Sequence, residues 1–219
     1  MENLFSEYLI ENGESSFSQN NQDKLVLFLL GESPGFFVEF GAVDGVALSN
    51  TFILEKSFNW AGIVCEPSIL SREKLIATRD CHIDFNCVTN KSGEVVSFIE
   101  TGNGLSSMEK YAYDDMWSDM RRDGYSYNVP TISLIDLLNK YDAPDVIDYL
   151  SIDTEGSELE ILTAYDFLRT FKVITVEHNY TDNREKIYDL LTSKGYVRVM
   201  EDRSKWDDWY IHESVSLPN

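Results

Sequence analysis

The sequence predicts an α/β fold, a mostly parallel sheet with helices on both faces. Strand-like apolar runs and helix-like segments alternate from residue 36 to residue 200, which is the pattern of parallel strands joined by crossover helices. The chain has 219 residues, enough for one well-buried domain and short for two. Because no internal repeat or domain boundary interrupts the alternation, residues 1–219 are predicted to form a single domain.

The predicted sheet begins with a strand over residues 36–40, and a turn that holds two glycines follows it. Gly41 and Gly45 lie in this turn, and residues 48–58 can form a helix behind it. An open α/β sheet begins a nucleotide pocket with this order of strand, glycine turn and helix. Glycine suits the turn because the backbone must bend sharply and approach the ligand without a Cβ in the way. The alternative is a strand followed by a tight turn that binds nothing.

The acids near this turn help to predict which nucleotide would bind there. The glycines do not have the GxGxxG spacing of a dinucleotide loop, and Glu39 and Asp44 lie within and beside the run. Carboxylates would repel the pyrophosphate of NAD, because like charges repel. They suit a ligand with a cationic amino-acid end and a neutral ribose, so we expect S-adenosylmethionine.

A second strand, over residues 62–67, ends in an acid that suits a ribose. Glu66 lies 27 positions after the acid of the first strand. This is close to the ~20-residue separation at which an acid binds a ribose diol in such folds. A carboxylate can accept hydrogen bonds from two neighbouring hydroxyls, although an acid that simply ends a strand is the alternative. The third predicted strand covers residues 82–88, and Asn86 or Asp84 near its end could reach an adenine edge.

Two later strands bring polar residues to the same edge of the predicted sheet. The fourth strand is followed by Asp153 and Glu155, and the next one, residues 172–177, ends in Glu177 and His178. Ligands of open α/β sheets bind outside the carboxyl ends of the strands, so we expect these four side chains to meet in one space. Helix capping is the alternative role for the first two acids.

The other elements are assigned from periodicity and turn residues. The predicted helices cover residues 2–11 and 24–30, a segment capped by Ser133, a segment behind Asp153 and residues 184–194, and the remaining strands cover 95–99, 146–152, 196–200 and 209–212. The last two strands can form a hairpin at the sheet edge.

Two segments lie outside the alternating strands and helices of the predicted sheet. Residues 1–35 are predicted to form a helical N-terminal cap, in which the amides around Gln19 fold over the pocket mouth or form only a surface loop. Residues 101–130 are irregular and rich in glycine, serine and aromatic residues. Aromatic side chains with hydroxyls suit a sugar, so we expect an acceptor lid there, with a hydrophobic flap as the alternative.

Composition narrows the partners and the compartment. The chain has 38 acidic and 18 basic side chains, a formal net charge of −20, so neither nucleic acid nor an anionic membrane is expected to bind. Cys65, Cys81 and Cys87 are odd in number and lack CxxC spacing, which disfavours disulfides and zinc. Free thiols, the lack of a signal-peptide pattern at the N-terminus and the lack of a long apolar run predict a soluble, cytoplasmic protein.

The motifs taken together resemble the FkbM-type S-adenosylmethionine-dependent methyltransferases. The resemblance covers residues 18 to 200. It rests on five stretches in the same order: Ser18-Gln19-x-x-Gln22-Asp23, Phe37 to Gly45 with Leu48 to Thr51, Gly62 to Pro67, Ile152 to Glu158, and Val176 to Asn179. Val43 departs from the pattern, because many relatives carry a polar residue such as Asn there.

This resemblance implies a class I, Rossmann-like methyltransferase domain that methylates hydroxyl groups of sugars or polyketide-like small molecules. The implied cofactor-binding residues are Gln19, Glu39, Gly41, Ala42, Asp44, Gly45, Ser49, Glu66, Asn86 and Asp153. Glu66 would hold the ribose, and Asp153 and Glu155 would border the site of methyl transfer.

The sequence leaves two routes by which the acceptor hydroxyl could lose its proton. His178 is a candidate general base, because the reference pKa of histidine lies near neutrality, although a structural histidine is an equal alternative. Asp153 and Glu177 could instead hold Mg²⁺ through hard oxygen ligands. The acceptor would be a glycan or another polyhydroxy small molecule. Two other functions stay open: a non-catalytic binding module on this fold, and an NAD-dependent oxidoreductase, which the missing GxGxxG disfavours.

Overall fold

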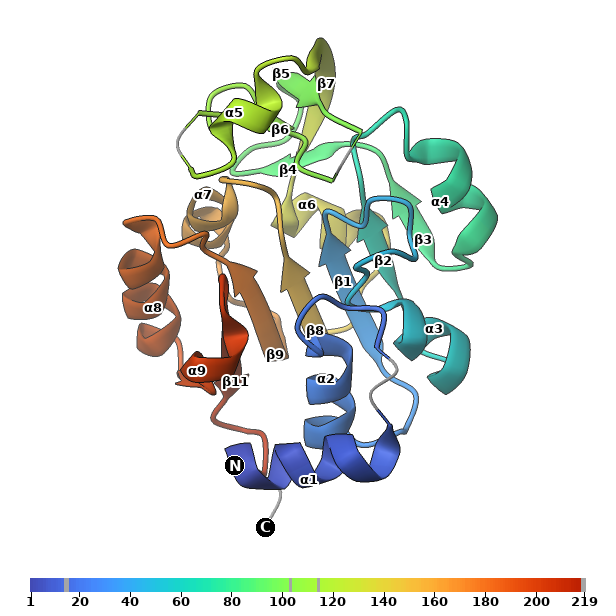
Figure 1. Ribbon diagram of the computed structural model, residues 1–219, viewed down its shortest axis with the longest axis vertical. Coiled ribbons are helices and arrows are strands. Elements are labelled where there is room, and N and C mark those ends of the chain that lie inside the picture. The colour runs from blue at the N-terminus through green and yellow to red at the C-terminus, as the bar shows by residue number, and fades with distance from the viewer. Residues whose placement is uncertain (14–15, 103, 114, 218–219) are drawn as a thin grey trace.

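The computed structural model describes residues 1–13, 16–102, 104–113 and 115–217, and a large sheet forms the centre of this part of the chain (Figure 1). Over these residues the sheet has seven strands in the order β10-β11-β9-β8-β1-β2-β3. The strands are β1 (Phe36–Phe40), β2 (Ala61–Cys65), β3 (His82–Asp84), β8 (Val146–Ile152), β9 (Thr170–Glu177), β10 (Tyr196–Val199) and β11 (Asp207–His212). The run from β9 to β3 is parallel, and β11 and β10 add the predicted antiparallel hairpin at one edge.

Helices cover both faces of this sheet, as predicted. One face carries α1 (Glu2–Asn12), α2 (Gln22–Leu30), α3 (Phe52–Phe58) and α4 (Arg72–Thr78), and the other carries α6 (Leu134–Lys140), α7 (Glu158–Ala164) and α8 (Asn183–Ser193). Successive side chains of a strand point to opposite faces. Phe37 of β1 therefore packs in one core with Leu25 and Leu54, whereas Val38 packs in the other with Leu137. The chain folds as a three-layer α/β/α domain.

A smaller sheet lies over the carboxyl ends of the parallel strands, at the top of Figure 1. Its strand order is β4-β7-β5-β6, formed by β4 (Cys87–Thr89), β7 (Tyr125–Ser133), β5 (Val95–Glu100) and β6 (Ser107–Met108). The short helix α5 (Ser118–Arg121) packs beside it, and α9 (Glu201–Ser204) connects the strands of the edge hairpin. The segment predicted as a lid thus contributes β6, α5 and most of β7 to an ordered layer, with residues 103 and 114 outside the described residues.

Two predicted elements differ from the structure by more than a shift of one or two residues at their ends. The strand expected over residues 82–88 is two strands, β3 in the large sheet and β4 in the small one, because the chain changes sheet at a turn in which Asp84 accepts a hydrogen bond from the Asn86 amide. The helix expected over 48–58 begins only at Phe52, because Leu48 is left-handed with φ of 62° and the next residues bind the carboxylate of Glu39.

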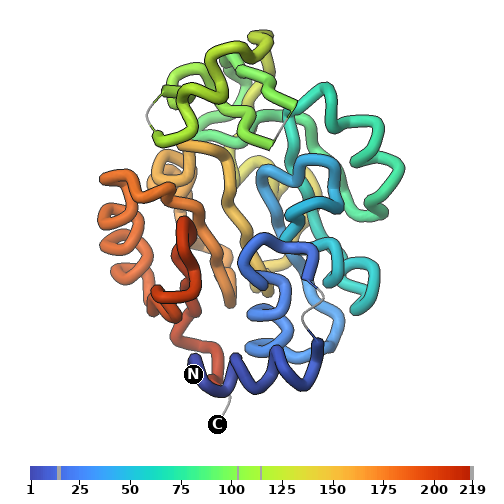
Figure 2. Tube along the Cα trace, in the orientation of Figure 1, coloured from blue at the N-terminus to red at the C-terminus, as the bar shows by residue number. Residues whose placement is uncertain are grey.

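The N-terminal segment divides into two parts. Figure 2 shows α1 at the end of the molecule opposite the small sheet, so this helix does not cover the carboxyl ends of the strands. The loop before α2 does reach that edge, where Ser18 forms a bridge with Leu48. Among the described residues, no helix combines the length and the apolar character needed to cross a membrane.

Candidate active site

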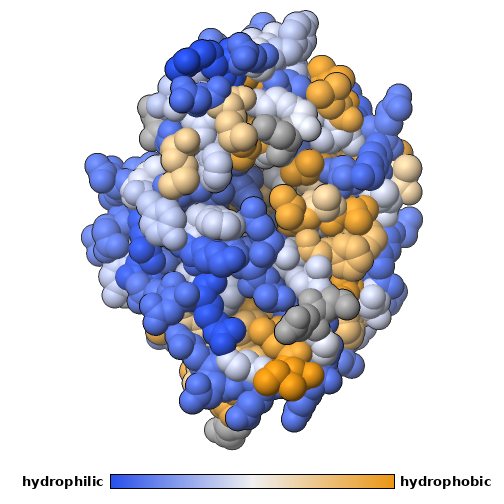
Figure 3. Space-filling model, in the orientation of Figure 1, coloured by the Kyte–Doolittle hydropathy of each residue, from blue (hydrophilic) through white to orange (hydrophobic). Residues whose placement is uncertain are grey.

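A cavity of about 750 Å³ lies between the carboxyl ends of the parallel strands and the small sheet. Figure 3 shows a hollow near the centre of this face, with hydrophobic residues along one rim and hydrophilic residues along the other. The residues predicted for the site that line the cavity are Gln19, Gly41, Asp44, Glu66, Asn86, Asp153, Glu155 and Glu177. Glu39, Ala42, Gly45, Ser49 and His178 are not part of its lining.

The glycine turn after β1 brings two strand ends into contact. Gly41 has φ of 77°, and a Cβ added there would lie 2.0 Å from the backbone oxygen of Asp153. Only glycine allows the chain to turn this tightly against the end of β8. The turn therefore places the predicted cofactor loop directly beside the acids that follow β8.

Glu39 has a different place from the one predicted for it. The residue is 2% exposed, and its carboxylate accepts hydrogen bonds from the Ser49 and Thr51 hydroxyls and from the Asn50 amide. The buried guanidinium of Arg79 completes this set at 3.3 Å. Glu39 and Ser49 thus shape the loop behind the cavity. In this arrangement neither side chain is placed to contact a cofactor directly.

Glu66 presents its carboxylate to the cavity and is held there by two backbone amides. Oε1 accepts from the Ser68 amide and Oε2 from the Val43 amide, both at 2.8 Å. Each oxygen keeps a second lone pair, which suits the two hydroxyls of a ribose. Burial raises the pKa of Glu66 to about 7, against the effect of these two hydrogen bonds. Asn86 lines the same end of the cavity, where its side chain donates to Asp84.

Two further groups fit the amino-acid end of S-adenosylmethionine. Asn50 lines the cavity, and its Oδ1 is buried without a hydrogen-bond partner among the described residues. An unpaired buried acceptor is costly, and an ammonium group would satisfy it. Gln19 lies at the mouth, where its Oε1 accepts from Trp206 Nε1 at 2.5 Å. Asn50 and Gln19 thus fit the amino-acid end of the cofactor, and Glu66 fits its ribose.

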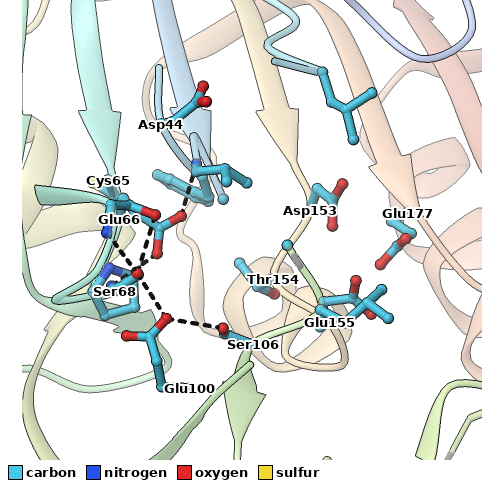
Figure 4. Close-up of a pocket in the computed structure, with 18 of the residues that line it drawn as sticks. Asp44, Cys65, Glu66, Ser68, Glu100, Ser106, Asp153, Thr154, Glu155 and Glu177 are labelled. Atoms are coloured by element: carbon cyan, nitrogen blue, oxygen red, sulfur yellow. Dashed lines mark hydrogen bonds between the residues drawn. The ribbon is translucent and has the colours of Figure 1, made fainter. Parts of the chain in front are cut away.

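Three acids gather on the opposite side of the cavity from Glu66. Asp153 and Glu155 follow β8, Glu177 ends β9, and one carboxylate oxygen of each lies within 4.8 Å of the others. Figure 4 shows these side chains pointing toward one another. Glu158, not Asp153 or Glu155, caps the turn, since it accepts from the amides of Thr154 and Gly156.

Burial and neighbouring negative charges raise the pKa values of all three acids of this cluster. Burial and the negative Glu158 raise the pKa of Asp153 to about 7. Burial and Asp153 raise the pKa of Glu155 to about 9, against the effect of Arg121. Burial, and then the charges of the other two acids, hold the pKa of Glu177 well above its usual range. Shifts of this size are typical of functional sites.

The acid cluster also fits a divalent cation. Carboxylate oxygens are the ligands that Mg²⁺ prefers, and three of them converge here. Glu177 Oε2 is buried with no hydrogen-bond partner among the described residues, so it is available as a ligand. The predicted pair of Asp153 and Glu177 is thereby extended by Glu155.

His178 is placed as a structural residue. Its Nδ1 accepts from the Tyr180 amide at 3.0 Å, and its Nε2 lies 3.0 Å from the backbone oxygen of Asp207, to which it donates. Burial lowers the pKa of His178, so the ring is neutral near pH 7. Because both nitrogens are engaged and the ring does not line the cavity, this geometry corrects the prediction that His178 acts as the base.

The structure also brings in residues that the sequence patterns did not single out for the site. Glu100 lines the cavity and binds the Ser68 hydroxyl, the Ile69 amide and the Tyr127 hydroxyl. Arg121 pairs with Glu155. No motif marks these two residues, because the partners just named are 27 to 34 positions away in the sequence.

Comparison with known proteins agrees with this geometry. The sequence profile of the Methyltransferase FkbM domain matches residues 39–198. The chain belongs to this FkbM methyltransferase family. The match covers most of the chain and includes the glycine turn, Glu66 and the acid cluster. No curated protein matches the chain with significance.

Solved structures resemble this FkbM domain to different degrees. An FkbM methyltransferase from Methylobacillus flagellatus KT is 12% identical with a TM-score of 0.52, over 85% of this chain and 47% of that one. This chain therefore spans about half the length of that relative. An O-methyltransferase from Bacillus cereus, solved in complex with SAH, is 12% identical with a TM-score of 0.45, over 96% and 87% of the two chains. A precorrin-6y C5,15-methyltransferase from Geobacter metallireducens GS-15 is 15% identical with a TM-score of 0.44, over 88% and 86%.

Proposed function

We propose that this FkbM-family domain transfers the methyl group of S-adenosylmethionine to a hydroxyl of a neutral polyhydroxy acceptor, such as a sugar or glycan. The observation that carries the proposal is the cluster of Asp153, Glu155 and Glu177 beside the glycine turn. The cluster lies in one cavity with Glu66 and Asn50, the groups that fit the cofactor. Carboxylates can bind and deprotonate a hydroxyl at the point where the methyl group would arrive.

The charge of the cavity favours a neutral acceptor over an anionic one. Its acidic lining residues are Asp44, Glu66, Glu100, Asp153, Glu155 and Glu177. Among the described lining residues Lys74 is the basic one, and it is paired with Asp44. A phosphate or carboxylate on the acceptor would meet this field unfavourably. Nucleic acid is disfavoured as an acceptor for the same reason. The neutral hydroxyls of a sugar carry no charge for these acids to repel.

The proposed reaction is a direct displacement. The acceptor oxygen forms a bond to the methyl carbon, the carbon–sulfur bond breaks, and its electron pair stays on sulfur to give S-adenosylhomocysteine. The hydroxyl proton passes to the carboxylate of Asp153, whose pKa of about 7 suits a base at neutral pH. Glu155 and Glu177, whose raised pKa values favour the protonated carboxyl, can hold the other acceptor hydroxyls by donating and accepting hydrogen bonds. If Mg²⁺ is bound by the three acids, it lowers the pKa of the acceptor hydroxyl.

A titration followed by a turnover screen tests this proposal. We expect calorimetry to give a micromolar Kd for S-adenosylmethionine and no binding of NAD. We then expect mass spectrometry to find S-adenosylhomocysteine and O-methylated product with neutral glycosides. Absence of cofactor binding would favour the non-catalytic binding module, and methylation only of amines or carboxylates would overturn the O-methyl assignment. Turnover that EDTA abolishes and Mg²⁺ restores would support the metal, and unchanged turnover in EDTA would remove it.

We also propose that the protein works in a reducing compartment such as the cytoplasm. Cys65, Cys81 and Cys87 are free thiols in the structure, and burial raises the pKa of each. Thiols of this kind are unreactive structural residues. Cell fractionation with an antibody would test the location directly.

A further inference from the structure

Arg121 is a buried arginine that joins the acid cluster to the small-sheet side of the cavity. Its side chain is 0% exposed although it ends α5, a single short helix. Its Nε donates to the backbone oxygen of Leu105 at 2.7 Å, and its Nη1 donates to the backbone oxygen of Ala112 and to Asp115. Its Nη2 donates to Glu155 Oε2 at 2.5 Å. The guanidinium thus binds three points of its own segment and one acid of the cluster.

The same segment also holds the backbone of Glu155. Glu155 has φ of 57°, a left-handed conformation that is unfavourable for a residue with a Cβ. The Ser107 hydroxyl donates to the Glu155 backbone oxygen at 2.7 Å. Tyr111 lies against Gly156 so closely that an added Cβ would come 2.6 Å from the Tyr111 Cβ. These contacts maintain a turn that the local chain disfavours.

We infer that Arg121 is a positioning residue for methyl transfer, an inference that rests on the proposed function. The docked segment, residues 104–124 leaving out 114, supplies Trp117 and Met120 to the cavity lining. The bond from Arg121 to Glu155 fixes this wall relative to the acid cluster. Arg121 thereby sets where an acceptor lies between the wall and the acids, without touching the acceptor itself.

The chemistry of the bond explains why arginine is needed. Of the three acids, Glu155 is the one with an ion-pair partner among the described residues. A guanidinium offers five N–H donors in a fixed plane, and Arg121 uses them on four separate acceptors. A lysine keeps the charge but can satisfy only some of these acceptors. It should therefore retain only part of the function of Arg121.

The neighbouring arginine supplies a matched control for the experiment. Arg122 has a side chain 74% exposed and pairs only with Asp119 in the described structure. We would prepare Arg121→Met, Arg121→Lys and Arg122→Met. For each we would measure the Kd of S-adenosylmethionine, the kcat and KM for the acceptor, and hydrogen exchange of residues 153–157.

We expect Arg121→Met to lower kcat/KM for the acceptor about 100-fold, to change the cofactor Kd less than threefold, and to speed exchange at residues 153–157. Arg121→Lys should recover at least tenfold of the loss, and Arg122→Met should match the wild type. Normal kinetics per folded molecule in Arg121→Met would reduce its role to stability and overturn the inference. If the wild type binds the cofactor but methylates no acceptor tried, the proposed acceptor is wrong. Hydrogen exchange then tests Arg121 by itself. Unchanged exchange at residues 153–157 in Arg121→Met would still refute the positioning role of Arg121.

Discussion

Two groups of buried acids lie at the carboxyl edge of the sheet, and they differ in how completely the protein satisfies them. Behind the β1 turn, the Glu39 carboxylate accepts from two hydroxyls, a backbone amide and the guanidinium of Arg79. In the acid cluster, Asp153 and Glu177 have no cationic partner among the described residues, and Glu177 Oε2 has no hydrogen bond there. Buried carboxylates are costly unless paired. The satisfied acid builds the loop, whereas we expect a ligand to complete the crowded acids.

The largest expected effect is on turnover, from Asp153→Asn. The amide keeps the shape but cannot take the hydroxyl proton, so we expect kcat to fall by about 10²- to 10⁴-fold. The Tm should stay level or rise, because one charge leaves a crowded cluster. Asp148→Asn is the control, since Asp148 lies at the other end of β8, where it binds Lys172 and the Phe36 amide. Full activity in Asp153→Asn would remove Asp153 from the mechanism.

The second prediction concerns stability at the satisfied acid. Glu39→Ala removes one of the carboxylates that balance the buried charge of Arg79, and it leaves the donors of residues 49–51 without their acceptor. We therefore expect urea denaturation to show a loss of about 3 kcal/mol in unfolding free energy. Glu94→Ala, which removes an exposed pair with Lys91, should cost less than about 0.5 kcal/mol. Unchanged stability together with much weaker binding of S-adenosylmethionine would reverse the comparison and make Glu39 a ligand.

These two acids also show how far the sequence could lead. The order of elements, the edge hairpin and the convergence of strand ends could be predicted, because apolar periodicity and turn residues are local signals. Glu39 and Asp153 look alike in such patterns, since each lies at a strand end with a glycine two or three positions later. Only the fold shows that residues 49–51 and Arg79 surround one of them while other acids surround the second.

The residues that the sequence patterns misplaced or missed depend on contacts between distant segments. His178 is withdrawn from the cavity because β11, the sheet neighbour of β9, supplies the backbone oxygen of Asp207 to which its ring donates. Arg121 reaches Glu155 across 34 positions, through a segment whose short elements leave no clear periodicity. The change of sheet between β3 and β4 was hidden because one alternating run covers both strands.

The third prediction is a pH dependence of stability that the buried acids on both sides of the cavity produce. Folding raises the pKa of Asp153 and Glu66 to about 7, so the folded chain binds more protons than the unfolded one. Stability is then greatest near pH 4.5 and falls as pH rises to 7, by about 1.4 kcal/mol per pH unit for each proton taken up. Thermal unfolding between pH 5 and 8 measures the slope. Glu177→Gln should flatten it, whereas a stability that rises with pH would contradict the shifts.

The smallest expected effect is that of Ser49→Ala, which tests whether the loop behind β1 is purely structural. The Ser49 hydroxyl donates to Glu39 and accepts from the Phe52 amide, so its loss should cost about 1 kcal/mol of unfolding free energy. The other donors to Glu39 remain, so the Kd of S-adenosylmethionine should change less than twofold. Ser97→Ala, which removes an exposed hydroxyl pair with Ser126, controls for loss of a hydroxyl. A tenfold weaker Kd in Ser49→Ala alone would restore Ser49 to the cofactor site and show that both groups of acids serve the ligand.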